Sequence, residues 1–130
     1  MSTDVTREVD TGFLQGFADA WNRHDIYGIM SFMADDCIFE LSSGPEAFGT
    51  RYEGRYDVRE GYMKIFETFP DAQWGDPRHF VCGDRGVSEW TFTATLQDGT
   101  KTEVNGCDLF TFRDGKIAIK NSYRKHRTKP

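Results

Sequence analysis

Apolar residues in the first half of the chain recur at steps of three and four, which is the spacing of one face of an α-helix. The first such stripe predicts a helix over residues 6–23. A second, short helix should follow Asp25, whose side chain can cap it. Asp57 and Glu60 have the spacing of a capping box and predict a third helix that ends at Pro70. The first stripe consists of Val9, Phe13, Phe17, Ala20 and Trp21.

The rest of the chain predicts strands. Residues 37–41 are rich in β-forming side chains, whereas residues 42–55 hold three glycines and a proline and should be mostly loop. Four further strands should follow Pro70, with turns at Gly83–Gly86, Asp98-Gly99 and Asp114-Gly115. This order of elements predicts one α+β domain over residues 1–130, in which a curved antiparallel sheet packs on a helical layer, with a basic tail at 125–130. The four strands are expected at 73–82, 87–96, 102–112 and 116–125.

The last turn predicts which side chains share a face. A two-residue loop at Asp114-Gly115 places Asp108 opposite Asn121. Even-numbered loops at the other two turns would bring Glu89 and Arg78 to the same face, and a three-residue loop would turn Glu89 outward. This face is the one that we expect to be buried. Its apolar members are Phe110, Phe112, Ile117, Ile119 and Tyr123.

Asp108 is the candidate functional residue on this face. An unpaired carboxylate in a core is costly, so it is paired, neutralised or placed at a wet cavity. Two alternatives follow: Asp108 is an acid or base in a ligand pocket, with Asn121 and Glu89 beside it, or it is a structural group that pairs with Arg78 or a neighbouring strand. The pocket would be lined by Phe17, Trp21, Tyr62, Arg78, Phe110, Phe112 and Tyr123.

The same register leaves an apolar outer face. Trp90, Phe92, Cys107 and Leu109 would point away from the helices. A large exposed apolar patch usually marks an interface. Either this face joins two copies of the chain in a homodimer, or the register predicted for residues 87–96 is wrong.

Composition narrows the class of protein. The chain has 130 residues, 15% of them aromatic, and a net charge of −5. The aromatic content argues against disorder, and the acidic charge argues against a nucleic acid partner. The sequence has no apolar run of membrane-spanning length and its first residues do not resemble a signal peptide, so we expect a cytoplasmic protein. Its three cysteines lack metal-ligand spacing and no phosphate-binding glycine loop is present, so we expect neither a metal nor an organic cofactor.

Five motifs resemble the SnoaL-like polyketide cyclase group of the nuclear transport factor 2-like and ketosteroid isomerase-like superfamily. The resemblance covers about residues 13–123 and implies a cone-shaped sheet that wraps three helices around a pocket, and often a homodimer through the outer face of the sheet. The motifs are Ala20-Trp-Asn-Arg-His-Asp25, Met33-Ala-Asp-Asp-Cys37, Phe69-Pro-Asp71, Gly106-Cys-Asp-Leu-Phe-Thr-Phe112 and Asp114-Gly-Lys-Ile117.

The residues of this chain match the catalytic residues of the related enzymes only in part. Ketosteroid isomerases have an Asp at the position of Asp108, but their base and Tyr positions fall on Leu41 and Phe17. The related cyclases use an Asp with a His, and the register places His79 on the outer face. Arg78, Glu89 and Asp108 imitate the Asp-Arg-Asp set of the related epoxide hydrolases only loosely.

The expected function is therefore acid–base catalysis of an isomerase or cyclase type on a small apolar or ring-containing molecule, with a lyase or hydrolase as further alternatives. A non-catalytic ligand-binding module and a dimeric assembly module of the same fold remain open.

Overall fold

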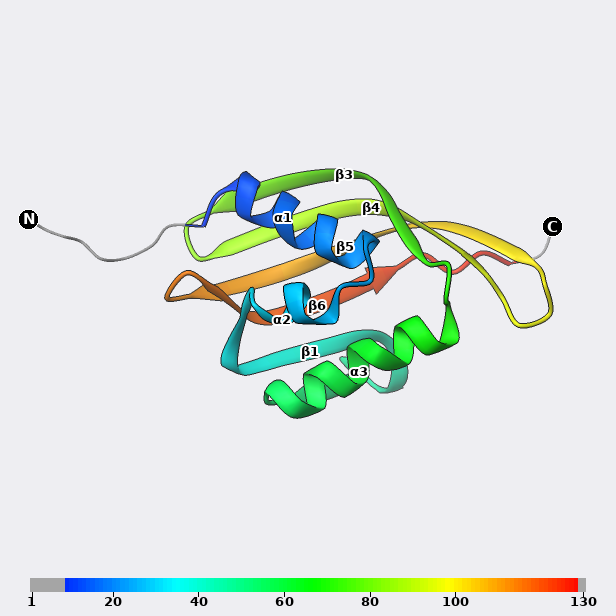
Figure 1. The fold of residues 1–130 in the computed structure, drawn as a ribbon, viewed down its shortest axis with the longest axis horizontal. Helices are drawn as coiled ribbons and strands as arrows, with labels where there is room; N and C mark the ends of the chain where they lie inside the picture. Colours follow the sequence, from blue (N-terminus) through cyan, green and yellow to red (C-terminus); the bar gives the residue numbers. More distant parts are fainter. Residues whose placement is uncertain (1–8, 129–130) are drawn as a thin grey trace, which may run out of the picture.

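The computed structural model describes residues 9–128 and shows helices and strands in the predicted α+β arrangement (Figure 1). The helices are α1 (Thr11–Asn22), α2 (Ile26–Met30) and α3 (Arg55–Thr68). The strands are β1 (Met33–Glu46), β2 (Gly49–Glu53), β3 (Gln73–Cys82), β4 (Arg85–Thr95), β5 (Lys101–Arg113) and β6 (Lys116–Arg124).

All six strands belong to one curved sheet in the order β2-β1-β6-β5-β4-β3. Only the contact between β1 and β6 is parallel; the other neighbours are antiparallel. Helix α1 lies along the β3 side of the sheet and α3 along the β1 side, so that the helices cover one face (Figure 1). The core fills the space between the helices and this inner face.

The start predicted for the second helix is confirmed, whereas α1 begins at Thr11 and not at residue 6. Asp10 caps α1 by accepting a hydrogen bond from the Phe13 N–H, at 2.8 Å, and Asp25 caps α2 through the Gly28 N–H, at 3.0 Å. The capping box predicted at Asp57 is wrong, because α3 begins at Arg55 after Gly54, which makes no side-chain cap. Residues 6–8 of the first predicted helix lie outside the described residues.

The loop predicted for residues 42–55 is also wrong. This segment forms the end of β1 and all of β2, which pair antiparallel through Phe39–Tyr52 and Leu41–Thr50. Gly49 allows the reversal: its φ is +81°, and a Cβ there would collide with the Leu41 carbonyl oxygen. Pairing along the strand therefore overrides the local preference of a glycine-rich sequence.

A β-bulge corrects the predicted face of β6. Phe112 pairs with Ile117 as predicted, but Thr111 pairs with Ile119, which leaves Ala118 as an extra residue. Asp108 consequently lies opposite Ser122 rather than opposite Asn121. From this bulge onward the two faces are exchanged: Lys120, Ser122 and Arg124 share the inner face, and the inward placement predicted for Asn121 and Tyr123 is wrong.

The turns before and after β4 correct the face of that strand. Cys82 pairs with Arg85 across a two-residue turn, and Thr95 pairs with Lys101 across five residues. Because the second loop is odd, Glu89 faces outward and lies opposite Arg78, so the inward placement predicted for both residues is wrong.

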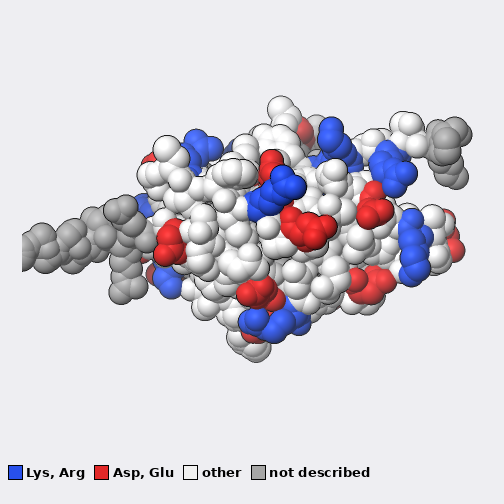
Figure 2. All heavy atoms as spheres, turned by 90° about the horizontal axis from the view of Figure 1, so that it is seen from above, with Lys and Arg blue, Asp and Glu red and all other residues white. Residues whose placement is uncertain are grey.

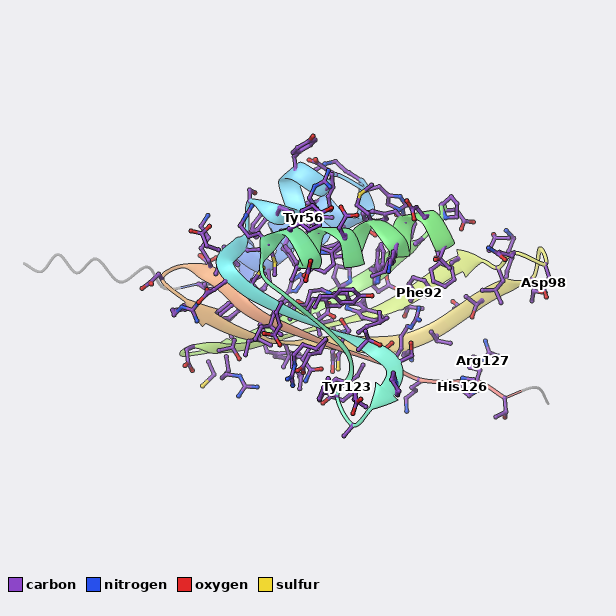
Figure 3. All side chains as sticks on the ribbon, turned by 90° about the horizontal axis from the view of Figure 1, so that it is seen from below. Tyr56, Phe92, Asp98, Tyr123, His126 and Arg127 are labelled. Atoms are coloured by element: carbon purple, nitrogen blue, oxygen red, sulfur yellow. The ribbon has the colours of Figure 1, made fainter. Side chains whose placement is uncertain are left out.

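The outward placement predicted for Trp90 and Phe92 is wrong for the same reason. Their exposed fractions are 8% and 1%, and both lie on the helix side of the sheet. Leu109 does lie on the outer face. Figure 3 shows Phe92 beneath the helices and Tyr123 on the opposite side of the sheet.

On the face shown in Figure 2, acidic and basic side chains are interspersed and form no extended basic patch. None of the helices between residues 9 and 128 has the length and apolar character needed to cross a membrane.

Candidate functional site

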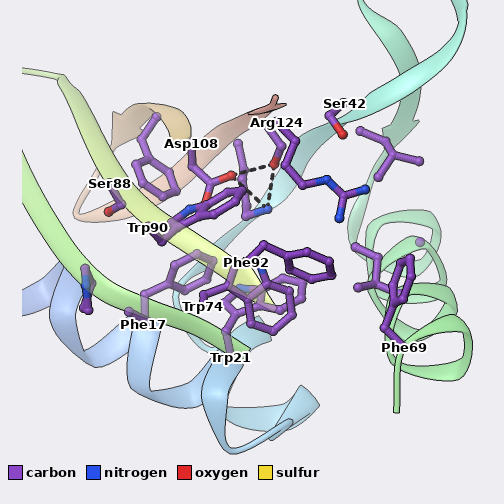
Figure 4. Close-up of a pocket in the computed structure, with 18 of the residues that line it drawn as sticks. Phe17, Trp21, Ser42, Phe69, Trp74, Ser88, Trp90, Phe92, Asp108 and Arg124 are labelled. Atoms are coloured by element: carbon purple, nitrogen blue, oxygen red, sulfur yellow. Dashed lines mark hydrogen bonds and ion pairs between the residues drawn. The ribbon is translucent and has the colours of Figure 1, made fainter. Parts of the chain in front are cut away.

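A cavity of about 400 Å³ lies between the inner face of the sheet and helices α1 and α3. Its wall is mostly apolar and rich in aromatic rings, and a group of polar side chains projects from the sheet into it (Figure 4). The aromatic wall includes Phe17, Trp21, Trp74, Trp90, Phe92 and Phe110. The polar group consists of His79, Ser88, Asp108, Lys120, Ser122 and Arg124.

Asp108 projects from β5 into the wall of this cavity and is surrounded by donors. Its Oδ2 accepts a hydrogen bond from the Trp90 indole, at 3.0 Å, and its Oδ1 accepts one from the Ser122 hydroxyl, at 2.6 Å. The Lys120 ammonium lies 3.4 Å from Oδ1. The carboxylate is thus buried with its hydrogen bonds made, and the structural partner predicted for it, Arg78, is on the other face of the sheet.

Lys120 is the main functional candidate that the sequence did not predict. Its side chain is 7% exposed, and Nζ donates a hydrogen bond to the Ser122 hydroxyl, at 3.0 Å. The ammonium also lies 4.6 to 5.4 Å from three ring centroids, within the range of cation–π attraction. These rings belong to Trp21, Phe39 and Tyr62.

Burial has a clear effect on this lysine. It lowers the pKa of the Lys120 ammonium, because a charged amine is disfavoured away from water. The Asp108 carboxylate offsets part of this lowering, whereas the positive charge of Arg124 lowers the pKa further. Lys120, Ser122 and Asp108 therefore form a hydrogen-bonded series in which the lysine donates to the serine and the serine to the carboxylate, as the dashed lines of Figure 4 show. Such a series can hold and redistribute a proton.

His79 supplies a second titratable group to the cavity. Its Nδ1 lies 2.8 Å from the Ser88 hydroxyl and its Nε2 lies 2.9 Å from the Gln15 amide oxygen. Because an amide oxygen only accepts, Nε2 carries a proton here and Nδ1 accepts from Ser88 when the ring is neutral. Burial lowers the pKa of His79, which favours the neutral ring. The outward placement predicted for His79 is wrong, because the odd loop after β4 turns that strand over and β3, which pairs with it, turns with it.

Some of the aromatic residues predicted for the pocket line the cavity, and the others lie elsewhere. Phe17, Trp21 and Phe110 lie in the cavity wall. Tyr62 and Phe112 belong to the core, whereas Tyr123 is 52% exposed on the outer face. Burial raises the pKa of the Tyr62 phenol well above its ordinary value, so it stays protonated.

The cavity lacks a carboxylate at the position of the ketosteroid isomerase base. Leu41 lies in the wall there, and the neighbouring Glu40 points to the other face, where it pairs with Arg51 at 2.7 Å. Nowhere in residues 9–128 do three His, Cys, Asp or Glu side chains come together as a metal site. Among the side chains that line the cavity, Asp108, Lys120 and His79 are our candidates for acid–base chemistry.

Breaking the buried pair should be costly for stability. We expect Lys120→Met to lower the free energy of unfolding by about 3–5 kcal/mol, because it leaves the Asp108 charge buried without its cation. The double variant Lys120→Met/Asp108→Asn should lose less than the sum of the two single variants. Chemical denaturation of the four proteins measures this coupling.

The exposed Arg51–Glu40 pair provides the control. Arg51→Met should change the free energy of unfolding by only about 0–1 kcal/mol, as is usual for surface pairs. Strictly additive losses for Lys120 and Asp108 would show that the two side chains do not interact.

Solved structures share this fold. A candidate polyketide cyclase from Xanthomonas campestris pv. campestris is 23% identical, with a TM-score of 0.77 over 87% of both chains. A second candidate polyketide cyclase, from Pseudomonas putida KT2440, is 16% identical, with a TM-score of 0.78 over 93% of both chains. TerC, co-crystallised with polyporic acid, is 22% identical, with a TM-score of 0.74 over 88% of this chain and 90% of that one.

Comparison with curated protein sequences gives no significant match. The family model of the SnoaL-like domain matches residues 14–119, which include most of α1, all of β5 and the first part of β6. This chain therefore belongs to the SnoaL-like family.

Proposed function

We propose that this protein is an acid–base enzyme that acts on a small ring-containing molecule in an isomerase- or cyclase-type reaction. The observation that carries the proposal is the series Lys120–Ser122–Asp108 in the wall of an aromatic cavity. Perturbed titratable groups in a cleft are typical of active sites. The proposal keeps Asp108 as the catalytic residue and replaces Asn121 and Glu89 by Ser122 and Lys120.

The cavity suits a ring-containing ligand. Its volume of about 400 Å³ falls within the range of roughly 300–1,000 Å³ that is usual for small-molecule sites. Aromatic walls favour flat rings, which they contact by stacking and edge-to-face packing. The aromatic compound polyporic acid, with which TerC was co-crystallised, supports the same class of ligand for this chain.

In the proposed mechanism Asp108 removes a proton from a carbon next to a carbonyl group. The Trp90 indole and the Ser122 hydroxyl fix the orientation of the carboxylate. The Lys120 ammonium stabilises it as an anion before the reaction and, through Ser122, supplies a positive charge close to the site of proton transfer. The carboxyl group that Asp108 becomes then returns the proton at a second atom of the substrate, which restores the carboxylate.

A ligand-binding module without catalysis is the second candidate. The observation in its favour is that Asp108 already accepts two hydrogen bonds and lies beside a cation, so that its position needs no catalytic explanation. The two candidates differ in turnover and not in affinity.

Exchange of an acidic C–H proton tests catalysis directly. We expect the protein to accelerate hydrogen–deuterium exchange at the α-carbon of 2-tetralone, a ring ketone, in deuterated buffer near neutral pH. Asp108→Asn should lower this exchange rate by about 10²–10⁴-fold, the usual contribution of a general base. Nuclear magnetic resonance measures the rate, below the melting temperature of each variant.

Glu89→Gln is the matched control, because it removes an exposed carboxylate from the outer face of the neighbouring strand; it should leave the exchange rate unchanged. Binding of 2-tetralone without faster exchange would favour the ligand-binding module. An unchanged rate in Asp108→Asn would remove Asp108 as the base.

We also propose that two copies of the chain join through the outer face of the sheet. Corrected registers leave a row of apolar side chains there, in place of the predicted Trp90 and Phe92, and Phe80 is 58% exposed within it. Exposed apolar patches of this kind usually mark interfaces. The row consists of Ile38, Phe80, Val87, Leu109 and Ile119.

Sedimentation should therefore give a mass close to twice the 14.9 kDa of the chain at micromolar concentration. Leu109→Lys should shift the protein to the mass of one chain, because it places a charge in the centre of the apolar row. Leu96→Lys, at the tip of the β4–β5 hairpin, is a control that should remain dimeric. A single-chain mass for the unaltered protein would contradict the proposal.

A further inference from the structure

Arg124 is an unusual member of the cavity wall. It lies on β6 two residues beyond Ser122, is half-buried, and reaches along the cavity toward Ser42 (Figure 4). Its guanidinium carbon lies 4.5 Å from the centroid of the Phe92 ring and 5.8 Å from that of Phe69. These rings hold the flat guanidinium in place without using any of its N–H donors.

The donors of Arg124 have no partner within residues 9–128. Neither a hydrogen bond nor an ion pair joins its guanidinium to another described residue. The same is true of Arg78, but that side chain is exposed on the outer face of the sheet. The remaining described arginines contact a carboxylate or a backbone carbonyl. A half-buried guanidinium whose N–H donors have no partner among the described residues can donate them to a ligand that supplies acceptors.

The charge of the cavity leads to the same conclusion. Its wall contains three cations, Lys64, Lys120 and Arg124, but Asp108 is its sole carboxylate among the described residues. Asp108 is occupied by Lys120, so the positive charge of Arg124 is not compensated. This cationic cavity lies in a chain whose net charge is −5, so the excess of positive charge is local to the site.

We infer that the ligand of this cavity is a flat aromatic anion whose carboxylate, or an equivalent acidic oxygen pair, binds the guanidinium of Arg124. The inference rests on the proposed function and names the substrate class for the same site. A guanidinium presents two parallel N–H donors that match the two oxygens of a carboxylate, and the rings that line the cavity would receive the aromatic part.

The position of Arg124 also limits the shape of the substrate. Residues two apart on a strand are separated by roughly 7 Å, and Ser122, the partner of Asp108, lies two residues before Arg124. An anionic group on Arg124 and a reactive carbon at the Asp108 carboxylate can therefore belong to one ligand in the same cavity. The substrate class that fits is an aromatic acid.

Two probes of almost equal shape separate charge from ring binding. We would measure by calorimetry the dissociation constants of 2-naphthoate and of its neutral isostere 2-naphthamide. The unaltered protein should bind 2-naphthoate at least about tenfold more tightly, which corresponds to about 1.4 kcal/mol, since only the carboxylate forms a charge-assisted pair with the Arg124 guanidinium. This ratio requires no variant.

Arg124→Gln should weaken the binding of 2-naphthoate at least about tenfold and change that of 2-naphthamide less than about threefold. Arg124→Lys should keep part of the preference, because the charge remains. Arg78→Gln, the exposed arginine without a partner, is the matched control and should bind both probes as the unaltered protein does.

Other outcomes would contradict the inference or the proposed function. Equal binding of both probes by the unaltered protein, or an equal loss of both in Arg124→Gln, would overturn the inference and leave ring binding in place. If neither probe binds, the aromatic ligand class of the proposed function fails as well.

Discussion

One extra residue in β6 positions three of the polar side chains of the cavity. Phe112 pairs with Ile117 and Thr111 with Ile119, so Ala118 has no partner in the ladder and the strand exchanges its faces at that point. A regular strand would turn Lys120, Ser122 and Arg124 away from the helices. The bulge instead directs them toward Asp108 on β5, in line with the known use of bulges to re-aim side chains next to functional sites.

This placement puts a lysine among aromatic rings, and its charge is stable there only because neighbouring groups compensate. The Asp108 carboxylate provides the counter-charge, Ser122 accepts a hydrogen bond from the ammonium, and the faces of three rings attract it. The same carboxylate is oriented by the Trp90 indole, which faces the cavity because the loop after β4 is odd. The aromatic wall and the polar series thus depend on each other, and both depend on strand register.

The sequence predicted the fold and the position of Asp108 but not the neighbours of Asp108. The helical stripes, the cap at Asp25 and the two-residue turn at Asp114-Gly115 are local signals that the sequence shows directly. A turn dipeptide shows where the chain reverses but does not give the number of residues in the loop, so the face of β4 was wrong. Residues 117–119 are all apolar and show no alternation, so nothing local marked the bulge at Ala118.

Titration of Lys120 tests the central claim most directly. With lysines labelled at the ε-carbon and Lys120 assigned from the Lys120→Arg variant, nuclear magnetic resonance gives the pKa of each ammonium. We predict that Lys120 titrates below the ordinary lysine pKa of about 10.4. Asp108→Asn should lower the pKa of Lys120 further, because the Asp108 carboxylate raises that pKa. A Lys120 that titrates together with the surface lysines, and is unaffected by Asp108→Asn, would contradict the buried pair on which the proposed site depends.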